Sequence, residues 1–373
     1  MKRRLNYRLV FLLVLLAALA IREVAVELRP SFLRPGLHLY AYVGNTGDGT
    51  VSAIDLIALH RSTTIATGPS PSGLRAHPSR PEIWGVSTDG GYAWIIDART
   101  GTLAAKIPVG ALPYAVDFSP DGKRAYVAAS GDGTVVAIDT ATRQVVARGR
   151  AGRKPWIARA TPDGNTVVVS NRDDGTVSLL NALTLAQLAI VQTAPAPEQI
   201  AILPDSSKAF VTSADVDQIS VIDLKQRVLL ANLALGGTPS DLILKPDGGE
   251  LYIPSANAHG LLVVNTSTAE VGDFLLLGMS PTSGVYHAAD STLYVTDSAA
   301  GHVIPVNMET RHVFGPIQAG QNPRTCVTTP GGDLLLVVDT SSDDLAVIRP
   351  KTSSLITLIP VGSRPRDLAV KVF

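Results

Sequence analysis

Eight prolines spaced 42 residues apart constrain this chain more than any other feature of its sequence. The interval repeats seven times without an insertion, and a glycine stands three residues before seven of the eight prolines. The prolines are Pro71, Pro113, Pro155, Pro197, Pro239, Pro281, Pro323 and Pro365. A fixed period of about 20 to 50 residues indicates a repeat architecture, in which each period is one structural unit packed on the next.

A single repeat, residues 113–152, divides into four short apolar segments separated by turn residues. The segments are residues 114–118, 124–129, 134–138 and 144–148. The first turn reads Ser119-Pro120-Asp121-Gly122, and Asp132-Gly133 marks a tight hairpin, because Asp and Gly accept the backbone angles that such turns need. Four strands of about five residues in every period predict one blade of a β-propeller.

The number of repeats fixes the number of blades. Residues 38–373 comprise 336 positions, which is eight periods of 42. The first repeat begins at its second strand, whereas residues 366–372 follow Pro365 as an inner strand without a blade of its own. We therefore predict an all-β, eight-bladed propeller of four-stranded blades, in which the C-terminal strand completes the first blade. Closing the ring in this way removes the free sheet edges that promote aggregation.

The amino terminus has the pattern of an export signal. Four basic residues within positions 2–8 precede an uncharged run at 9–21, which ends near Ala18-Leu19-Ala20. Thirteen residues are too few for a membrane span of about 20 but fit the apolar region of a signal peptide, about 7 to 15 residues. We predict a signal peptide at 1–20, a linker at 21–37 and the propeller at 38–373. The alternative is an uncleaved signal anchor, which would be the only attachment to a membrane.

The repeat also resembles a known family. The recurring order is proline, apolar strand, Pro-Asp-Gly turn, Tyr-Val strand, Asp-Gly-Thr-Val hairpin and Asp-Thr turn, and one strand reads Tyr294-Val295-Thr296-Asp297. This pattern is similar to the YVTN family of β-propeller repeat proteins over residues 38–373. The resemblance implies a periplasmic, cell-surface or secreted propeller of a bacterium or archaeon. It implies no catalytic residues, because the family has no shared catalytic motif.

Composition excludes several kinds of site. Lys+Arg 32 balances Asp+Glu 32, so the chain has no bulk attraction for nucleic acid, which is the weakest of the partners considered. The single cysteine, Cys326, cannot form an internal disulfide and occupies a column of buried apolar residues. No metal-ligand spacing and no catalytic constellation is present, although His77 and His287 share one repeat column. The sequence identifies neither catalytic nor metal-binding residues, and it leaves any cofactor unknown.

Charged and aromatic residues beside the prolines suggest a binding site. The loops that lead into the inner strands of a propeller surround a central funnel, and here basic and aromatic residues occupy one side of the ring. We call this set the basic arc and predict that it binds an anionic ligand. Its members are Arg75, Tyr114, Arg153, Lys154, Trp156, Arg159, Arg324, Arg364 and Arg366.

Two less specific explanations apply to parts of the basic arc. Arg75, Asp117 and Arg159 occupy one repeat column in three consecutive blades, so they could neutralise one another as an ionic row between blades. The remaining basic residues could be solvated charges on the rim.

The sequence supports two classes of function. The first is an exported, non-enzymatic binding or scaffolding propeller of the cell envelope, with an anionic small molecule or an envelope protein as its partner. The alternative is a propeller enzyme or cofactor protein, either a lactonase-like hydrolase or a haem d1-type protein, that uses residues lining the channel. This alternative rests on analogy of fold.

Overall fold

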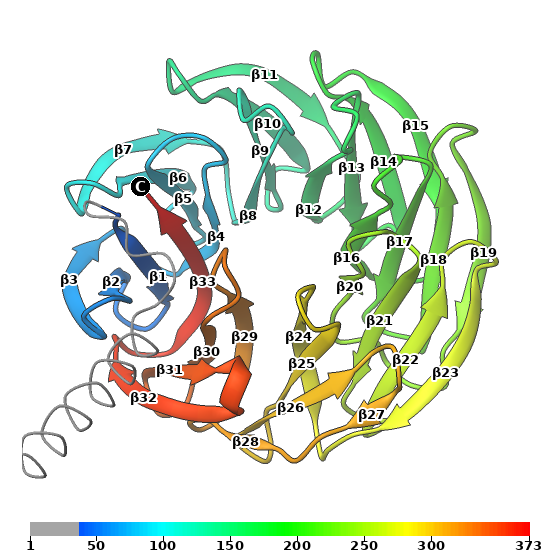
Figure 1. Ribbon diagram of the computed structural model, residues 1–373. Helices are drawn as coiled ribbons and strands as arrows, with labels where there is room; N and C mark the ends of the chain where they lie inside the picture. The colour runs from blue at the N-terminus through cyan, green and yellow to red at the C-terminus, as the bar shows by residue number, and fades with distance from the viewer. Residues whose placement is uncertain (1–36) are drawn as a thin grey trace, which may run out of the picture. The chain divides into compact units, whose positions relative to one another are not determined.

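The computed structural model describes residues 37–373, so the predicted signal peptide and nearly all of the predicted linker lie outside the described residues. Eight antiparallel sheets stand in a ring around a common axis (Figure 1). The eight-bladed propeller predicted from the 42-residue period is confirmed. Within the described residues, no helix has the length and apolar composition needed to cross a bilayer.

The strands of each blade run from the channel outward in a fixed order. The inner strands, in ring order, are β33 (Pro365–Val372), β4 (Pro71–Ala76), β8 (Pro113–Phe118), β12 (Pro155–Ala160), β16 (Pro197–Ile202), β20 (Ile243–Leu244), β24 (Pro281–His287) and β29 (Pro323–Thr328). The second strands are β1 (Leu39–Asn45), β5 (Glu82–Ser87), β9 (Arg124–Ala129), β13 (Thr166–Asn171), β17 (Lys208–Ser213), β21 (Glu250–Ser255), β25 (Thr292–Asp297) and β30 (Leu335–Asp339).

The third and outer strands complete each sheet. The third strands are β2 (Thr50–Asp55), β6 (Tyr92–Asp97), β10 (Thr134–Asp139), β14 (Thr176–Asn181), β18 (Gln218–Asp223), β22 (Gly260–Asn265), β26 (His302–Asn307) and β31 (Asp344–Arg349). The outer strands are β3 (His60–Ala66), β7 (Thr102–Pro108), β11 (Gln144–Arg150), β15 (Gln187–Gln192), β19 (Val228–Ala234), β23 (Glu270–Leu276), β27 (His312–Val313) with β28 (Ile317–Gln318), and β32 (Ser354–Pro360). A 3-10 helix at Pro350–Thr352 joins β31 to β32.

Two blades depart from the regular pattern. The inner strand β20 has only two residues, and the outer strand beside β26 is divided into β27 and β28. Gly315 and Pro316 lie in the break between β27 and β28, and proline has no N–H for the ladder. These irregularities leave the number and order of the blades unchanged.

The ring closes between the two ends of the described chain. Strand β33 pairs antiparallel with β1, with Leu39 opposite Val372 and Val43 opposite Leu368. The backbone of His38 exchanges two hydrogen bonds with Phe373. A shared apolar core, which includes Leu39, Leu336, Val338 and Leu368, joins the first blade to the last. The predicted closure by the C-terminal strand is therefore confirmed.

The repeated columns of the sequence have clear structural roles. The aromatic residues at the second strand, such as Tyr42 and Tyr126, are buried, and the hydroxyls of these two donate to a backbone carbonyl of the adjacent blade. The Asp and Asn column closes the turns after the third strands; Asp55 Oδ1, for example, accepts from the N–H groups of Ile57 and Ala58. Gly110 has φ +121°, which an L side chain rarely adopts.

Candidate ligand-binding site

A β-bulge at the start of the inner strands directs two neighbouring residues toward the channel. In β8 the pairing jumps from Pro113 to Val116, and the same shift follows the first proline of β12, β16 and β29. A bulge places two residues opposite one on the partner strand, which redirects their side chains. Both residues after every one of the eight prolines consequently line the central cavity.

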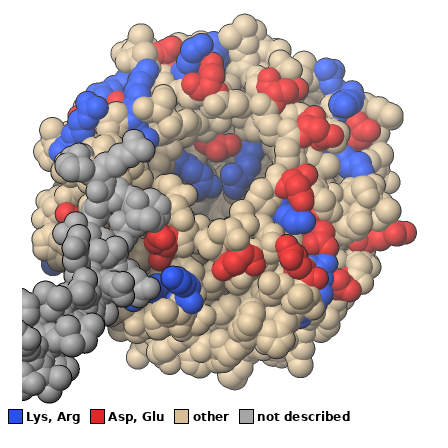
Figure 2. All heavy atoms as spheres, viewed as in Figure 1, with Lys and Arg blue, Asp and Glu red and all other residues tan. Residues whose placement is uncertain are grey.

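The cavity has a volume of about 800 Å³, within the usual range for a small-molecule site. Figure 2 shows a central hollow in this face, with basic and acidic side chains inside it. Nine charged residues line the cavity, five of them arginines and four carboxylates: Arg75, Asp117, Arg159, Glu198, Asp241, Arg324, Arg364, Arg366 and Asp367. Charges of both signs therefore meet here, with a small excess of arginine.

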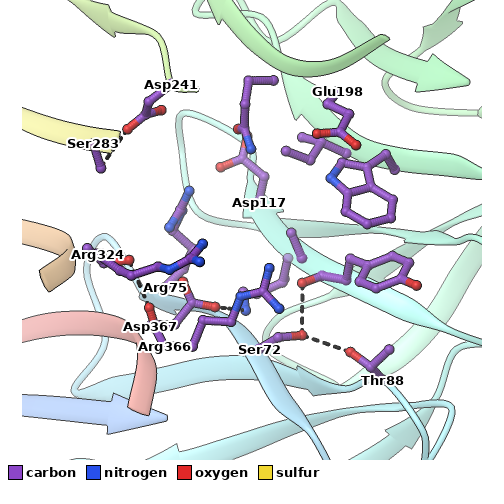
Figure 3. Close-up of a pocket in the computed structure, with 18 of the residues that line it drawn as sticks. Ser72, Arg75, Thr88, Asp117, Glu198, Asp241, Ser283, Arg324, Arg366 and Asp367 are labelled. Atoms are coloured by element: carbon purple, nitrogen blue, oxygen red, sulfur yellow. Dashed lines mark hydrogen bonds between the residues drawn. The ribbon is translucent and has the colours of Figure 1, made fainter. Parts of the chain in front are cut away.

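Each of the four carboxylates has a partner in the protein. Asp367 Oδ2 accepts from the N–H of Gly73 on the next inner strand at 2.6 Å, and Asp117 Oδ2 accepts from the N–H of Ala160 at 3.3 Å. Asp241 Oδ2 accepts from Ser283 Oγ at 2.6 Å (Figure 3). Glu198 forms an ion pair with Arg172, N to O 2.8 Å. The acidic side chains thus stabilise contacts within and between blades.

The guanidinium groups of the five cavity arginines form no ion pairs among residues 37–373. None of the guanidinium groups of Arg75, Arg159, Arg324, Arg364 and Arg366 lies within 4.0 Å of a carboxylate there. In Figure 3 the guanidinium groups of Arg75, Arg324 and Arg366 point into one space, whereas Asp241 and Glu198 lie across the cavity from them. Unpaired guanidinium groups that converge on a cavity can bind a carboxylate or phosphate, often through two parallel hydrogen bonds.

Burial changes the pKa values of two groups in the channel wall. Burial lowers the pKa of the Arg159 guanidinium, and the negative charge of Asp117 opposes that shift. Burial raises the pKa of the Asp241 carboxyl, and hydrogen bonds from Ser283 and the Leu242 N–H oppose it. The exposure that Arg159 retains is toward the cavity, because the residue lines it.

The two aromatic residues of the basic arc stack on each other. The ring centroids of Tyr114 and Trp156 lie 4.0 Å apart, with 28° between the planes. The Arg172 guanidinium lies over the Trp156 ring, 5.8 Å from its centroid. An aromatic ligand would therefore stack on the outer face of Tyr114 or displace one of these partners.

Arg153 and Lys154 do not line the central cavity. Arg153 forms an ion pair with Asp174, and Lys154 lies 3.6 Å from Asp173. Both acids belong to the hairpin between β13 and β14, within the same blade. Arg153 instead borders a smaller pocket of about 600 Å³ on the rim, together with Arg172 and the two acids. Seven of the nine residues predicted from the sequence line the central cavity; these two are neutralised beside it.

Histidine and cysteine take no part in the cavity. His77 is buried, and its Nδ1 accepts from the N–H groups of Ser79 and Arg80, whereas His287 Nδ1 contacts Asp290 at 2.7 Å. Neither histidine lines the central cavity. Among residues 37–373, no group of three or more His, Cys, Asp or Glu is placed to hold a metal ion. Cys326 is buried, and that burial raises the pKa of its thiol.

Comparison with known proteins agrees with the fold. A family model described as a YNCE-like beta-propeller matches residues 122–290. No curated protein matches the sequence.

Three solved structures illustrate the structural similarity. Dihydro-heme d1 dehydrogenase NirN in complex with DHE has a TM-score of 0.73 at 17% identity, over 91% of this chain and 77% of that one. Apo AztD from Citrobacter koseri has a TM-score of 0.71 at 12% identity, over 90% and 98%. Kuenenia stuttgartiensis hydrazine synthase has a TM-score of 0.62 at 17% identity, over 75% and 95%. At these identities the likeness concerns the fold alone.

Proposed function

Because this chain is a β-propeller repeat protein of the YVTN type, we propose that it is an exported, non-enzymatic binding protein of the cell envelope that holds an anionic small molecule in its central channel. The observation that carries this proposal is the set of five cavity arginines whose guanidinium groups pair with no carboxylate among the described residues. The four carboxylates beside them already have partners, so a ligand anion would meet donors that the protein leaves unused.

The chemistry of the mouth favours a carboxylate or a phosphate. We call Arg324, Arg364 and Arg366 the mouth arginines; all three are exposed and lie on two adjacent blades. Arginine can bond the two oxygens of such an anion at once, and each hydrogen bond to a charged group contributes about 1.5 to 3 kcal/mol. Tyr114 offers an apolar surface nearby, which would add affinity for a ligand with a planar or aromatic body.

A thermal-shift screen of anionic metabolites tests this proposal. Anions that raise the melting temperature are then titrated against the parent and the Arg324→Ala/Arg366→Ala variant. We expect at least one anion to bind the parent and to lose at least tenfold in affinity in the variant. Equal affinity for both proteins would show that the channel arginines are only solvated charges.

Export is a separate part of the proposal and has its own test. Residues 9–21 and the Ala18-Leu19-Ala20 sequence support a cleaved signal peptide. We expect N-terminal sequencing of protein from the periplasm or the medium to begin near Ile21. Retention of Met1 in a membrane fraction would favour the signal anchor instead.

A bound cofactor is a second candidate, because one structural neighbour is a dihydro-heme d1 dehydrogenase in complex with DHE. A carboxylate-bearing macrocycle would be an anionic ligand of the same arginines. Visible absorption of the protein purified from its native host distinguishes this candidate from a colourless ligand. A lactone hydrolysis screen, with and without divalent metal, tests the enzymatic alternative.

A further inference from the structure

A second group of charged residues lies deeper in the channel than the mouth arginines. We call Arg75, Asp117 and Arg159 the floor; each stands four residues after its proline, on β4, β8 and β12. Arg324 and Arg366 stand one residue after theirs. At about 3.3 Å per strand residue, the floor lies roughly 8 to 10 Å farther along the channel.

Arg159 is an enclosed cation without a hydrogen-bond acceptor. Its Nε is buried and has no partner among the described residues. A guanidinium has five N–H donors, and burying such donors unpaired is costly. Arg75 is similar, because the one hydrogen bond of its side chain goes to the carbonyl of the neighbouring Leu74. Both residues line the cavity.

The nearby acids do not pair with these arginines. Asp117 accepts from the Ala160 N–H, and Asp241 accepts from Ser283 Oγ and the Leu242 N–H. Neither acid lies within 4.0 Å of Arg75 or Arg159. The floor is therefore not a row of direct ion pairs, and its donors remain available to a ligand.

We propose that Arg75 and Arg159 form a second anion subsite at the floor, so that the channel binds an elongated ligand with an anionic group at each end. The mouth arginines bind one end, and the floor binds the other. This inference rests on the proposed function, because the mouth must hold an anion for the second end to reach the floor. Enclosure strengthens the floor contact, since charges attract more strongly where water is excluded.

A series of carboxylates tests the second subsite on the purified propeller. Suberate has two carboxylates separated by six methylene groups, octanoate has the same number of carbons and one carboxylate, and succinate is too short to span the channel. We expect calorimetry to show suberate binding at least ten times more tightly than octanoate or succinate. Arg159→Met should reduce the affinity for suberate to that for octanoate, whereas the control Arg153→Met, on the rim, should not change it.

The melting temperature of the Arg159→Met variant distinguishes a ligand site from a row of charges that stabilises the blades. Methionine keeps an unbranched side chain without a charge, so Arg159→Met removes an enclosed cation that has no protein partner. We expect the variant to melt at the same temperature as the parent or about 2 °C higher. A fall of several degrees would show that Arg159 stabilises the blades, and would overturn the floor subsite.

The binding outcomes distinguish the two proposals. Equal affinity for suberate and octanoate, with both depending on Arg324 and Arg366, overturns the floor subsite and leaves the proposed function standing. Suberate binding that is unchanged by Arg159→Met also overturns the floor subsite. If no carboxylate and no anion of the metabolite screen binds the channel, both proposals fail.

Discussion

Two basic clusters on the same face of the propeller look equivalent in the sequence and differ in the structure. Arg153 and Lys154 precede Pro155, and Arg364 and Arg366 flank Pro365. The side chains of the first two are paired with Asp174 and Asp173, whereas neither guanidinium group of the second two lies within 4.0 Å of a carboxylate among residues 37–373. The backbone N–H of Arg364 donates to Asp343 Oδ1 at 2.8 Å.

The hairpin of the same blade determines this difference. Asp173 and Asp174 lie about 20 residues along the chain from the basic residues that they neutralise. The corresponding hairpin of the blade that β33 completes, between β1 and β2, carries Gly47 at the position of Asp173 and Asp48 at that of Asp174. Asp48 Oδ2 accepts from the backbone N–H of Ser363, the serine that stands in place of Arg153, at 2.6 Å. A basic residue on the rim of a propeller can therefore be judged only together with the hairpin beside it.

The largest expected difference between the clusters is in stability, because one of them belongs to a strand that closes the ring. Arg366 is the second residue of β33, which closes the ring, whereas Arg153 and Lys154 lie in a rim loop. Deleting residues 366–373 should expose Leu368 and the core of the first blade, at a cost of about 1.5 to 3 kcal/mol for each large side chain that loses its burial. We expect aggregation or a large fall in melting temperature. A truncated protein that melts like the parent would contradict ring closure by β33.

The second largest expected difference between the clusters is in their contribution to ligand affinity. We expect Arg324→Ala/Arg366→Ala to weaken a channel ligand about 100-fold, because two charge-assisted contacts are lost, and Arg153→Ala/Lys154→Ala to change its affinity less than twofold. Parent affinity should also fall as salt rises from 50 to 500 mM, by roughly tenfold, because mouth contacts are exposed. Calorimetry on the three proteins measures both effects. Similar losses of affinity in the two double variants would mean that both clusters contribute to ligand binding.

The pKa values of two acidic residues, Asp174 in the blade of β12 and Asp339 in the blade of β29, are shifted in opposite directions. Hydrogen bonds from the Arg153 backbone N–H and guanidinium lower the pKa of Asp174. In the blade of β29, Asp339 and Asp344 face each other across β30 and β31, and burial, followed by the neighbouring Asp344, raises the pKa of Asp339 to about 8. The position of this pair in another blade holds Asn171 and Thr176, joined by a hydrogen bond of 3.1 Å.

The raised pKa of Asp339 predicts how stability changes with pH. The folded protein binds a proton that the unfolded chain releases above pH 4, so the stabilisation is complete below about pH 4 and declines until about pH 8. We expect the free energy of unfolding to fall by a few kcal/mol over this range. The Asp339→Asn/Asp344→Thr variant, which copies the Asn171–Thr176 pair, should lose most of this slope. Denaturant unfolding at pH 5, 7 and 9 measures it, and an unchanged slope would show that other groups cause it.

The smallest expected effect comes from converting the paired cluster into an unpaired one. Asp173→Asn/Asp174→Asn removes the carboxylates from Arg153 and Lys154 without changing side-chain size. We expect a weak additional anion site on the rim, visible in phosphate titrations at low salt as one more phosphate bound per chain than in the parent. A stoichiometry equal to that of the parent would show that loss of pairing alone does not make an anion site.

The fold could be predicted from the sequence because the residues that determine it recur every 42 positions. Eight prolines in register define the blades, and the missing inner strand of the first repeat identifies β33 as its replacement. The short β20 could not be predicted, since Pro239 and the apolar residues after it keep the regular period. The division into β27 and β28 has a local signal, because Gly315 and Pro316 lie outside that period.

The candidate site was less accessible to sequence reasoning. The repeat position predicts that Arg324 and Arg366 lie at the channel. Whether an arginine forms an ion pair depends on distances between strands, which the repeat does not give. Asp173 and Asp174 lie about 20 residues beyond Arg153 and Lys154 along the chain, so their proximity follows from the pairing of β13 with β14 and not from local sequence. The period also places Tyr114 and Trp156 on adjacent blades, but their stacking depends on side-chain orientation.

A structure of the propeller with the tightest anion from the metabolite screen tests most directly whether the channel, and not the rim, is the binding site. We expect the anionic group within hydrogen-bond distance of Arg324 and Arg366, with Arg153 and Lys154 still paired to Asp174 and Asp173. An anion bound at Arg153 and Lys154, with an unchanged channel, would contradict the proposed site.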